Sequence, residues 1–488
     1  MEHAGTGSAP VERSVAQAAP APARRARGGV RFALRRSGIE PALRLLACAL
    51  AILGDWLALW LRAPFSSAGV RAERRAGCQA RAAARLAATL GNLKGPFVKA
   101  GQFAANRHDL LPASVTTPLA ALRDQVPPLP FPEVRAAVES ELGAPLAVLV
   151  ADFEHEPLGA ASIAQVHRAR LRSGEVVAVK VQYPWLADSL RADLAWANAA
   201  LRVFARRHGA VDRQRLLSEF AAGLREELDF EREARVAAEI AVNLAHDPRV
   251  VVPRVLSSHS SRRVLTMSYL PAVRIDDRAG LARLGLAPKA VLEILARAYA
   301  KQVFVDGLFH ADPHPGNLFI VDEPTAAVSP RLLFIDFGLS RRLDPALRHE
   351  MRLGFYALLQ RDERAFLEGM LRMGMIAPGA REVVGRAIGD MYARIARRGG
   401  PLGVAGAQVL SLKDEAKALL QETPGLQLPN DLLLFAKTLS YLFALGSELD
   451  SEADLMRLCL PYLLQFVASR ETPLNHAPGA KDAGPAGG

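Results

Sequence analysis

The sequence predicts an α+β protein with two unequal lobes, a small one that contains strands and a larger one that is mostly helical. Short apolar runs rich in β-branched residues, bounded by turn residues, indicate the strands of the small lobe. Helical patterns fill 70–125 ahead of these strands, and they dominate again from residue 288 onward. The predicted strands lie at 163–171, 175–181, 263–270, 318–321 and 332–335.

The composition is that of a globular protein with two or three domains. The chain has 488 residues, of which 50% are hydrophobic and 23% are charged, and this excludes a collagenous, mucin-like or wholly disordered chain. The predicted segments are a disordered basic tail at 1–40, an amphipathic helix at 41–64, a helical extension at 70–132, a first lobe at 133–270, a second lobe at 271–470 and a disordered tail at 471–488.

The charge balance favours anionic partners. Sixty-one Lys and Arg residues stand against 50 Asp and Glu residues, a net charge of +11. A basic chain attracts nucleotide phosphates, membrane surfaces or nucleic acid. Nucleic acid is not expected, because only 6% of the residues are aromatic and no basic–aromatic signature occurs. Three cysteines without a CxxC pair predict neither a disulfide framework nor a cysteine metal site, and fit a reducing, cytoplasmic compartment.

Residues 41–62 are the most lipid-like segment. On a helix, Arg44, Asp55 and Arg62 fall within about 20° of one another, so an apolar helix with a narrow polar stripe is predicted. Its uncharged run, 45–54, is half of the ~20 residues that a span needs, and a longer span must bury Asp55 at about 2.5–3.5 kcal/mol. A helix lying on an anionic membrane surface is favoured; packing on the protein's own core and spanning stay open.

A lysine at the end of a buried strand is the first of four linked signals. Residues 177–180 read Val-Ala-Val-Lys, and a lysine so placed is positioned to reach phosphate oxygens across a cleft. The alternative for Lys180 is a solvated lysine at a strand end. The signal gains weight only from the segments that follow.

The segment 310–317, His-Ala-Asp-Pro-His-Pro-Gly-Asn, is more specific. Asp312 and Asn317 are five residues apart, which is the Asp-to-Asn spacing of the catalytic loop of kinases. The two prolines break the helix that would make its two histidines a metal-binding pair. A carboxylate and an amide on a rigid turn suit metal and phosphate handling, and His310 is expected to be a structural hydrogen-bonding residue.

Asp336 and Glu233 complete the set. Asp336-Phe337-Gly338 follows a predicted strand, 19 residues after Asn317, and a carboxylate at this strand end would hold Mg²⁺ against the β- and γ-phosphates. Glu233 lies on a predicted helix between the lysine strand and the catalytic loop. Such a glutamate pairs with the strand lysine and orients it in kinase-like folds; the alternative is a solvated acidic helix face.

Together these residues resemble the UbiB/AarF family of atypical, protein-kinase-like ATPases. Three further segments match motifs of that family. Lys99 and Gln102 resemble its KxGQ motif, residues 159–167 resemble its alanine-rich loop, and Glu227 and Asp229 resemble its ExD motif. The resemblance covers about residues 85–465.

The resemblance implies a protein-kinase-like two-lobe fold whose N-terminal helical extension places KxGQ over the active site. It also implies binding of ATP or ADP with Mg²⁺, ATP hydrolysis, membrane association, and a role in ubiquinone biosynthesis or related prenyl-lipid metabolism with lipid-biosynthetic partners. The implied catalytic set is Lys99, Gln102, Lys180, Glu227, Asp229, Glu233 and Asp312; the implied metal ligands are Asn317 and Asp336; the implied nucleotide-binding residues are Ala160, Ala161, Ser162, Lys180, Met267, Tyr269 and Leu270.

The chain also departs from ordinary kinases and from the family. Ala160 and Ala161 stand where a kinase has glycines, and their Cβ atoms disfavour the positive φ that lets a backbone close over phosphates. Ser268 stands where the family usually has Glu, and Pro271 where it has Gly. No Ala-Pro-Glu follows Asp336, so a peptide-docking segment is not expected. The apolar run at 458–467 is too short for the C-terminal membrane hairpin of UbiB.

Three functional classes follow from these observations. An ATPase or small-molecule kinase at the inner face of the cell membrane is favoured. A nucleotide-binding pseudokinase that acts as a scaffold for a lipid-biosynthetic complex is the first alternative, and a protein kinase is the second. The sequence names neither the phosphoryl acceptor nor the oligomeric state. It also predicts that Lys99 pairs with Glu227 or Asp229, because a desolvated lysine needs an acidic partner.

Overall fold

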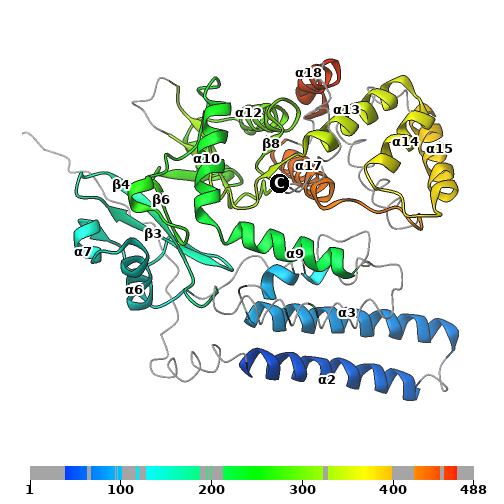
Figure 1. Ribbon diagram of the computed structural model, residues 1–488, viewed down its shortest axis with the longest axis horizontal. Helices are drawn as coiled ribbons and strands as arrows, with labels where there is room; N and C mark the ends of the chain where they lie inside the picture. The colour runs from blue at the N-terminus through cyan, green and yellow to red at the C-terminus, as the bar shows by residue number, and fades with distance from the viewer. Residues whose placement is uncertain are drawn as a thin grey trace, which may run out of the picture.

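The computed structural model describes residues 39–62, 67–93, 95, 97–101, 117–119, 128–186, 195, 198, 213–322, 328–397, 423–450 and 455–469. Figure 1 shows the small lobe around strands β3, β4 and β6 at one side, the helical lobe at the other, and two long N-terminal helices beneath them. The predicted α+β class with an N-terminal helical extension is confirmed. The tails predicted at 1–40 and 471–488 lie, apart from residues 39 and 40, outside the described residues.

The small lobe is an antiparallel sheet in the order β1-β3-β4-β6, with β2 paired to β3. Its turn between β3 and β4 uses Gly174 at φ +90°, a conformation that favours glycine. Helices α6 and α7 pack their apolar residues against β4 and its neighbours. The bounds are α6 Phe131–Leu142, α7 Leu146–Leu149, β1 Asp152–Phe153, β2 Gly159–Ala160, β3 Ala164–Arg170, β4 Val176–Gln182 and β6 Val264–Ser268.

Two helices and two small sheets join the lobes. Asp229 caps α10 by accepting a hydrogen bond from the Arg232 amide at 2.9 Å, which fixes where α9 ends and α10 begins. The second sheet has the order β5-β10-β9-β7, and β8 pairs with β11. The bounds are α9 Arg213–Glu227, α10 Phe230–Leu244, β5 Val250–Val251, η2 Ser257–His259, β7 Ala272–Arg274, β8 Leu308–Phe309, β9 Leu318–Val321, β10 Arg331–Phe334 and β11 Arg341–Arg342.

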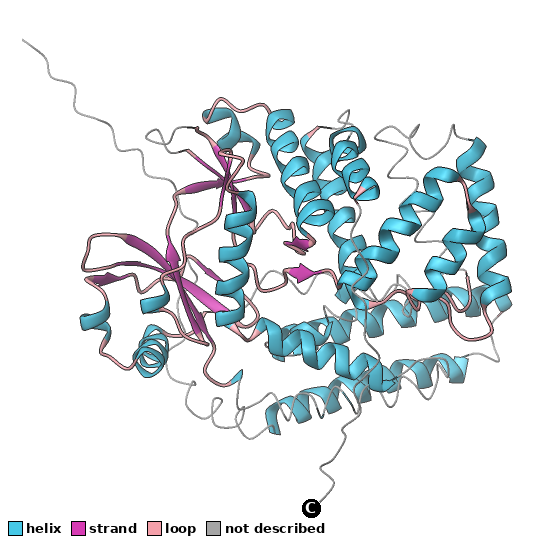
Figure 2. Cartoon of the chain, turned by 45° about the horizontal axis from the view of Figure 1, so that its top comes forward, coloured by secondary structure: helices cyan, strands magenta, loops and turns pink. Residues whose placement is uncertain are grey.

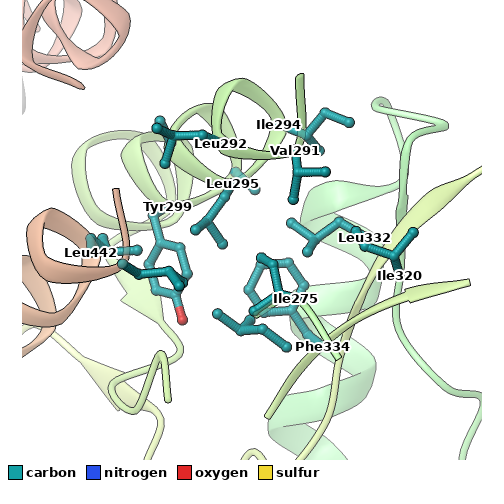
Figure 3. Close-up of a cluster of buried hydrophobic side chains, with 14 of the residues drawn as sticks. Ile275, Val291, Leu292, Ile294, Leu295, Tyr299, Ile320, Leu332, Phe334 and Leu442 are labelled. Carbon is teal, nitrogen blue, oxygen red and sulfur yellow. The ribbon is translucent and has the colours of Figure 1, made fainter. Parts of the chain in front are cut away.

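The helical lobe is built around α12, whose apolar side chains are buried along most of its length. Figure 3 shows Val291, Leu295 and Tyr299 of this helix facing Leu332 and Phe334 of β10. Figure 2 shows the helices gathered on the side away from the first sheet. The bounds are α11 Arg278–Arg283, α12 Pro288–Ala300, η3 Lys301–Asp306, α13 Pro345–Gln360, α14 Glu363–Arg372, α15 Arg381–Arg397, α17 Asn430–Leu449 and α18 Leu455–Ala468.

Helix α2 (Ile39–Arg62) packs along α3 (Ala68–Leu93), and Figures 1 and 2 show the two helices side by side. Arg85 of α3 donates hydrogen bonds to the Asp55 carboxylate at 2.7 Å and to the Ala51 carbonyl at 3.1 Å. Packing on α3 therefore accounts for Asp55 of the charged stripe. The opposite, apolar face stays outside; its exposed residues are Leu43, Leu46, Leu50, Leu53, Leu57, Trp60 and Leu61.

Two described helices are long and apolar enough to cross a membrane, by length and composition alone. They are Ala42–Leu61, of which 6% is buried within the protein, and Asp431–Leu449, of which 44% is buried. The sequence reading considered the first segment and overlooked the second. Its apolar character has a structural cause, because Leu432, Leu434, Leu442, Leu445 and Leu449 lie in the cores of the helical lobe.

Candidate active site between the lobes

Lys180 and Glu233 form a buried ion pair at the back of the site. The Lys180 Nζ donates to Glu233 Oε1 at 2.8 Å and to Oε2 at 2.9 Å, and the two side chains are 10% and 1% exposed. The alternation of β4 turns Lys180 toward α10, where the Phe230 ring centroid lies 5.1 Å from Nζ. The pairing predicted from the motif spacing is present, and the solvated-face alternative for Glu233 is wrong.

Asp336 meets the same lysine from the other lobe. The Lys180 Nζ donates to Asp336 Oδ1 at 2.8 Å, and the Asp336 side chain is 45% exposed. Its backbone has φ +60°, a region that non-glycine residues rarely occupy. One lysine is thus shared by a buried carboxylate and an accessible one.

His310 stabilises the backbone at Asp336. Its Nε2 lies 3.0 Å from the Ile335 carbonyl and 2.9 Å from the Asp336 carbonyl, and its Nδ1 lies 3.2 Å from the Tyr299 hydroxyl. The backbone amide of His310 donates to Gln302 Oε1 at 3.0 Å. His310 is fully buried, so the histidine expected to be structural holds the strained turn that presents Asp336.

The shared lysine separates the protonation behaviour of its two partners. Burial raises the pKa of Glu233 to about 7, with Asp336 adding to the rise and Lys180 opposing it. For Asp336 burial acts in the same direction, yet the charge and hydrogen bond of Lys180 bring its pKa below the ordinary range. The two carboxylates outweigh the burial of Lys180 and raise its pKa. Asp336 is therefore the anionic carboxylate of this cluster that solvent can reach.

The catalytic-loop segment forms a closed turn around Asp312. Asn317 Nδ2 donates to the Asp312 backbone carbonyl and to its Oδ2, both at 3.1 Å. The other carboxylate oxygen, Oδ1, accepts from Nζ of Lys437 at 3.1 Å. Lys437 belongs to α17 and is a site residue that sequence reasoning missed. One signal existed: it is the only Lys or Arg in the apolar helix Asn430–Leu449.

The helical extension reaches the site through Lys99, as predicted. Lys99 forms an ion pair with Glu227 at the end of α9, and the side chains are 14% and 12% exposed. The Gly95 amide also donates to the Ser162 carbonyl of the alanine-rich loop at 3.1 Å. Asp229 serves as the N-cap of α10. Gln102 lies outside the described residues.

The alanine-rich loop begins in β2 and is held by its own backbone. The Ala161 amide donates to the Ala164 carbonyl at 2.8 Å, and the Ala161 carbonyl accepts from the Tyr183 hydroxyl at 3.0 Å. Ala161 is exposed, Ala160 is half-buried and Ser162 is buried. The loop therefore presents Ala161 to solvent while Ser162 anchors the extension.

The residues assigned to the other edge of the nucleotide site lie at the end of β6 and directly after it. Met267, Tyr269 and Leu270 are half-buried, and the Arg168 guanidinium lies 5.1 Å from the Tyr269 ring centroid. The Tyr269 amide donates to the Val176 carbonyl at 3.0 Å. These residues continue the strand that connects the two lobes.

Asp336 and Asn317 provide oxygen ligands that suit a magnesium ion whose coordination is completed by phosphate. Mg²⁺ is usually held by one or two protein oxygens together with substrate phosphates and water. Asp336 binds Lys180 through Oδ1, so its Oδ2 can act as a metal ligand. Asn317 binds Asp312 through its amide nitrogen, so its amide oxygen can act as a second metal ligand. Within the described residues no three His, Cys, Asp or Glu side chains gather as a metal site, so Asn317 and Asp336 would hold the ion only together with a phosphate.

Comparison with known proteins agrees with this geometry. Residues 121–370 match the model of the ABC1 atypical kinase-like domain, which is more than half of the chain. The chain belongs to the ABC1 family of atypical kinase-like proteins. The match spans Lys180, Glu233, Asp312 and Asp336, the residues that the structure brings together.

Individual ABC1 relatives are similar over most of the chain. A "Probable protein kinase UbiB" of Xanthomonas axonopodis is 32% identical over 85% of this chain and 75% of its own. Arabidopsis "ACTIVITY OF BC1 COMPLEX KINASE 8, chloroplastic" is 31% identical over 77% of this chain, and the match covers only 53% of that protein. A solved structure titled as the complex of Rv3197 and erythromycin from Mycobacterium tuberculosis has a TM-score of 0.52 and 25% identity, and covers 80% of this chain and 97% of its own.

Proposed function

We propose that this ABC1 protein binds Mg-ATP between its lobes and transfers the terminal phosphoryl group to water or to a small molecule. The observation that carries the proposal is Lys180, held by Glu233 at 2.8 Å and by Asp336 at 2.8 Å. A lysine fixed in this way at the end of a buried strand can bind phosphate oxygens, while the accessible Asp336 carboxylate holds the metal.

Asp312, the carboxylate of the catalytic loop, would receive the proton that the acceptor loses. In the proposed step the acceptor oxygen forms a bond to the terminal phosphorus, and the bond from that phosphorus to the ADP oxygen breaks. ADP leaves with the electron pair, and the acceptor proton passes to the Asp312 carboxylate and then to solvent. Mg²⁺, held by Asn317 and Asp336, would neutralise charge on the phosphates.

Membrane association is the second part of the proposal. The exposed leucines of α2 cover one face of a 24-residue helix, a larger apolar surface than isolated exposed residues give a soluble protein. Asp55 of the polar stripe is paired with Arg85 on the inner side, so the apolar face is free to enter the headgroup region. This supports a peripheral position on the inner face of the cell membrane and a role in ubiquinone or related prenyl-lipid metabolism.

A pseudokinase scaffold is the second candidate. The Lys99–Glu227 ion pair ties the extension to α9 beside the site, an arrangement that suits a closed, non-catalytic binding module. Lys180, Asp312, Asn317 and Asp336 favour turnover over that reading. A protein kinase is the least favoured candidate, because no Ala-Pro-Glu segment follows Asp336.

Phosphate release from the purified full-length chain tests the proposal. We expect Mg-dependent release that increases with anionic liposomes, and candidate acceptors such as prenylated phenols are added in parallel. Deletion of residues 1–64 should abolish the liposome effect and leave nucleotide binding intact. Nucleotide binding without release under every condition would favour the scaffold. Liposome binding unchanged by the deletion would place the membrane contact elsewhere.

A further inference from the structure

A single cation lies in the apolar helix α17. Of the 20 residues of Asn430–Leu449, Lys437 alone is Lys or Arg. Its side chain is only 13% exposed, its Nζ donates to Asp312 Oδ1 at 3.1 Å, and Nζ also lies 5.6 Å from the Tyr441 ring centroid. Lysine is almost never this buried unless it is paired, so the contact with Asp312 accounts for its place in the helix.

The two donors at Asp312 divide its carboxylate between them. Asn317 Nδ2 binds Oδ2 and Lys437 Nζ binds Oδ1. A carboxylate held at both oxygens cannot rotate about its terminal bond without breaking one of these contacts. Its orientation is therefore set jointly by the catalytic-loop turn and by α17, more than a hundred residues later in the chain.

The loop itself contains no permanently charged cation. Residues 310–317 contain no Lys or Arg, and Lys180 is engaged with Glu233 and Asp336. Lys437 thus brings a cation to the carboxylate that meets the acceptor. Fixed charges placed where charge develops are among the largest contributions to catalysis.

We propose that Lys437 is a positioning residue for phosphoryl transfer, which holds the Asp312 carboxylate in the orientation that receives the acceptor proton. The inference rests on the proposed function. It also gives α17 a defined place: the Thr438 hydroxyl donates to the Ala311 carbonyl at 3.2 Å, so α17 is docked on the catalytic loop. A helix that is long and apolar enough to span a membrane is, on this account, part of the active site.

The test uses the full-length chain with Lys437→Met, Lys437→Gln and Lys437→Arg. Both neutral variants should lower kcat by about a hundred-fold, the size of a small misplacement of a reacting group, with the KM for Mg-ATP little changed. Lys437→Arg keeps the charge and should stay closer to the wild type. Ser447→Ala is the matched control on the same helix, because it removes an exposed hydrogen bond within α17, to the Phe443 carbonyl, and leaves the contacts of the helix with the loop in place; it should retain the wild-type kcat.

Four results of these experiments would contradict the role of Lys437 or the proposed function. A wild-type kcat in either neutral variant overturns the proposal. So does a loss of kcat in Ser447→Ala equal to that in Lys437→Met, because a general disturbance of α17 and not the loss of the ammonium would then explain the effect. Neutral variants that lose the Mg-ATP melting shift together with the rate would show a folding role and also overturn it. A wild-type chain that neither binds Mg-ATP nor releases phosphate contradicts the proposed function, a separate failure.

Discussion

Replacement of Glu233 by Gln should change the stability of the fold in a pH-dependent way, with the variant gaining stability relative to wild type as the pH rises. The Glu233 side chain is 1% exposed, and burial raises its pKa from 4.5 to about 7. A carboxyl whose pKa is higher in the folded state binds its proton more tightly there than in the unfolded chain. The folded state therefore loses stability as the pH rises from about 4.5 to about 7, and the loss is complete above that range.

The magnitude follows from the same two values. At about 1.4 kcal/mol per pH unit, the difference between 4.5 and about 7 corresponds to about 3 kcal/mol. Lys180 and Asp336 do not titrate between pH 5 and 8, because the pKa of the first is raised and that of the second is lowered. Burial lowers the pKa of His167, but this contribution is common to wild type and variant and cancels in their difference.

The assay is chemical denaturation of wild type and Glu233→Gln at pH 5, 6, 7 and 8. The free energy of unfolding of the variant, relative to wild type, should increase by up to about 3 kcal/mol across this range, while turnover falls because Lys180 loses its orienting partner. Glu239→Gln, at an exposed position of α10, controls for the loss of one negative charge. A difference between Glu233→Gln and wild type that stays constant from pH 5 to 8 would refute the reasoning.

Three further predictions concern the cleft. Asp336→Asn should abolish the Mg-dependent part of the melting shift with ATP, and an unchanged shift would remove Asp336 from the metal site. Lys99→Ala breaks the ion pair with Glu227 and should change the rate of phosphate release. An identical rate in Glu227→Gln and wild type would contradict a role of this ion pair in turnover. Ala161→Gly restores φ freedom to an exposed loop position and should tighten ATP binding about five-fold, with ADP changing less; paired titrations that leave both affinities unchanged would place the phosphates elsewhere.

Local patterns predicted the parts of the site that are built from short segments. The strand at 318–321 appears with the predicted bounds, and the Val-Ala-Val-Lys run lies in β4 and includes the lysine that meets Glu233. These predictions succeed because alternation, turn residues and motif spacing act within a few residues or in a fixed order along the chain. The Lys99–Glu227 pair was predicted only through the family resemblance, which places Lys99 over the site, together with the need of a desolvated lysine for an acidic partner.

Contacts between distant segments were not predictable in this way. Lys437 reaches Asp312 from a helix 125 residues away, and no motif connects the two. Asp229 is read equally well as a catalytic carboxylate or as a helix cap, and only the Arg232 amide at 2.9 Å shows that it caps α10. For α2 the helical wheel gives the polar stripe but not its partner, because Arg85 lies on another helix.

The central claim is that Lys180, held by Glu233 and Asp336, binds the phosphates of Mg-ATP. Calorimetric titration of Mg-ATP into the full-length wild type and into Lys180→Met tests it most directly. The account predicts saturable, Mg-dependent binding by the wild type and a loss of about ten-fold or more in affinity for the variant, as expected when a charge-assisted contact of roughly 1.5–3 kcal/mol is removed. Equal affinities, in a variant that melts at the wild-type temperature or above, would contradict the claim.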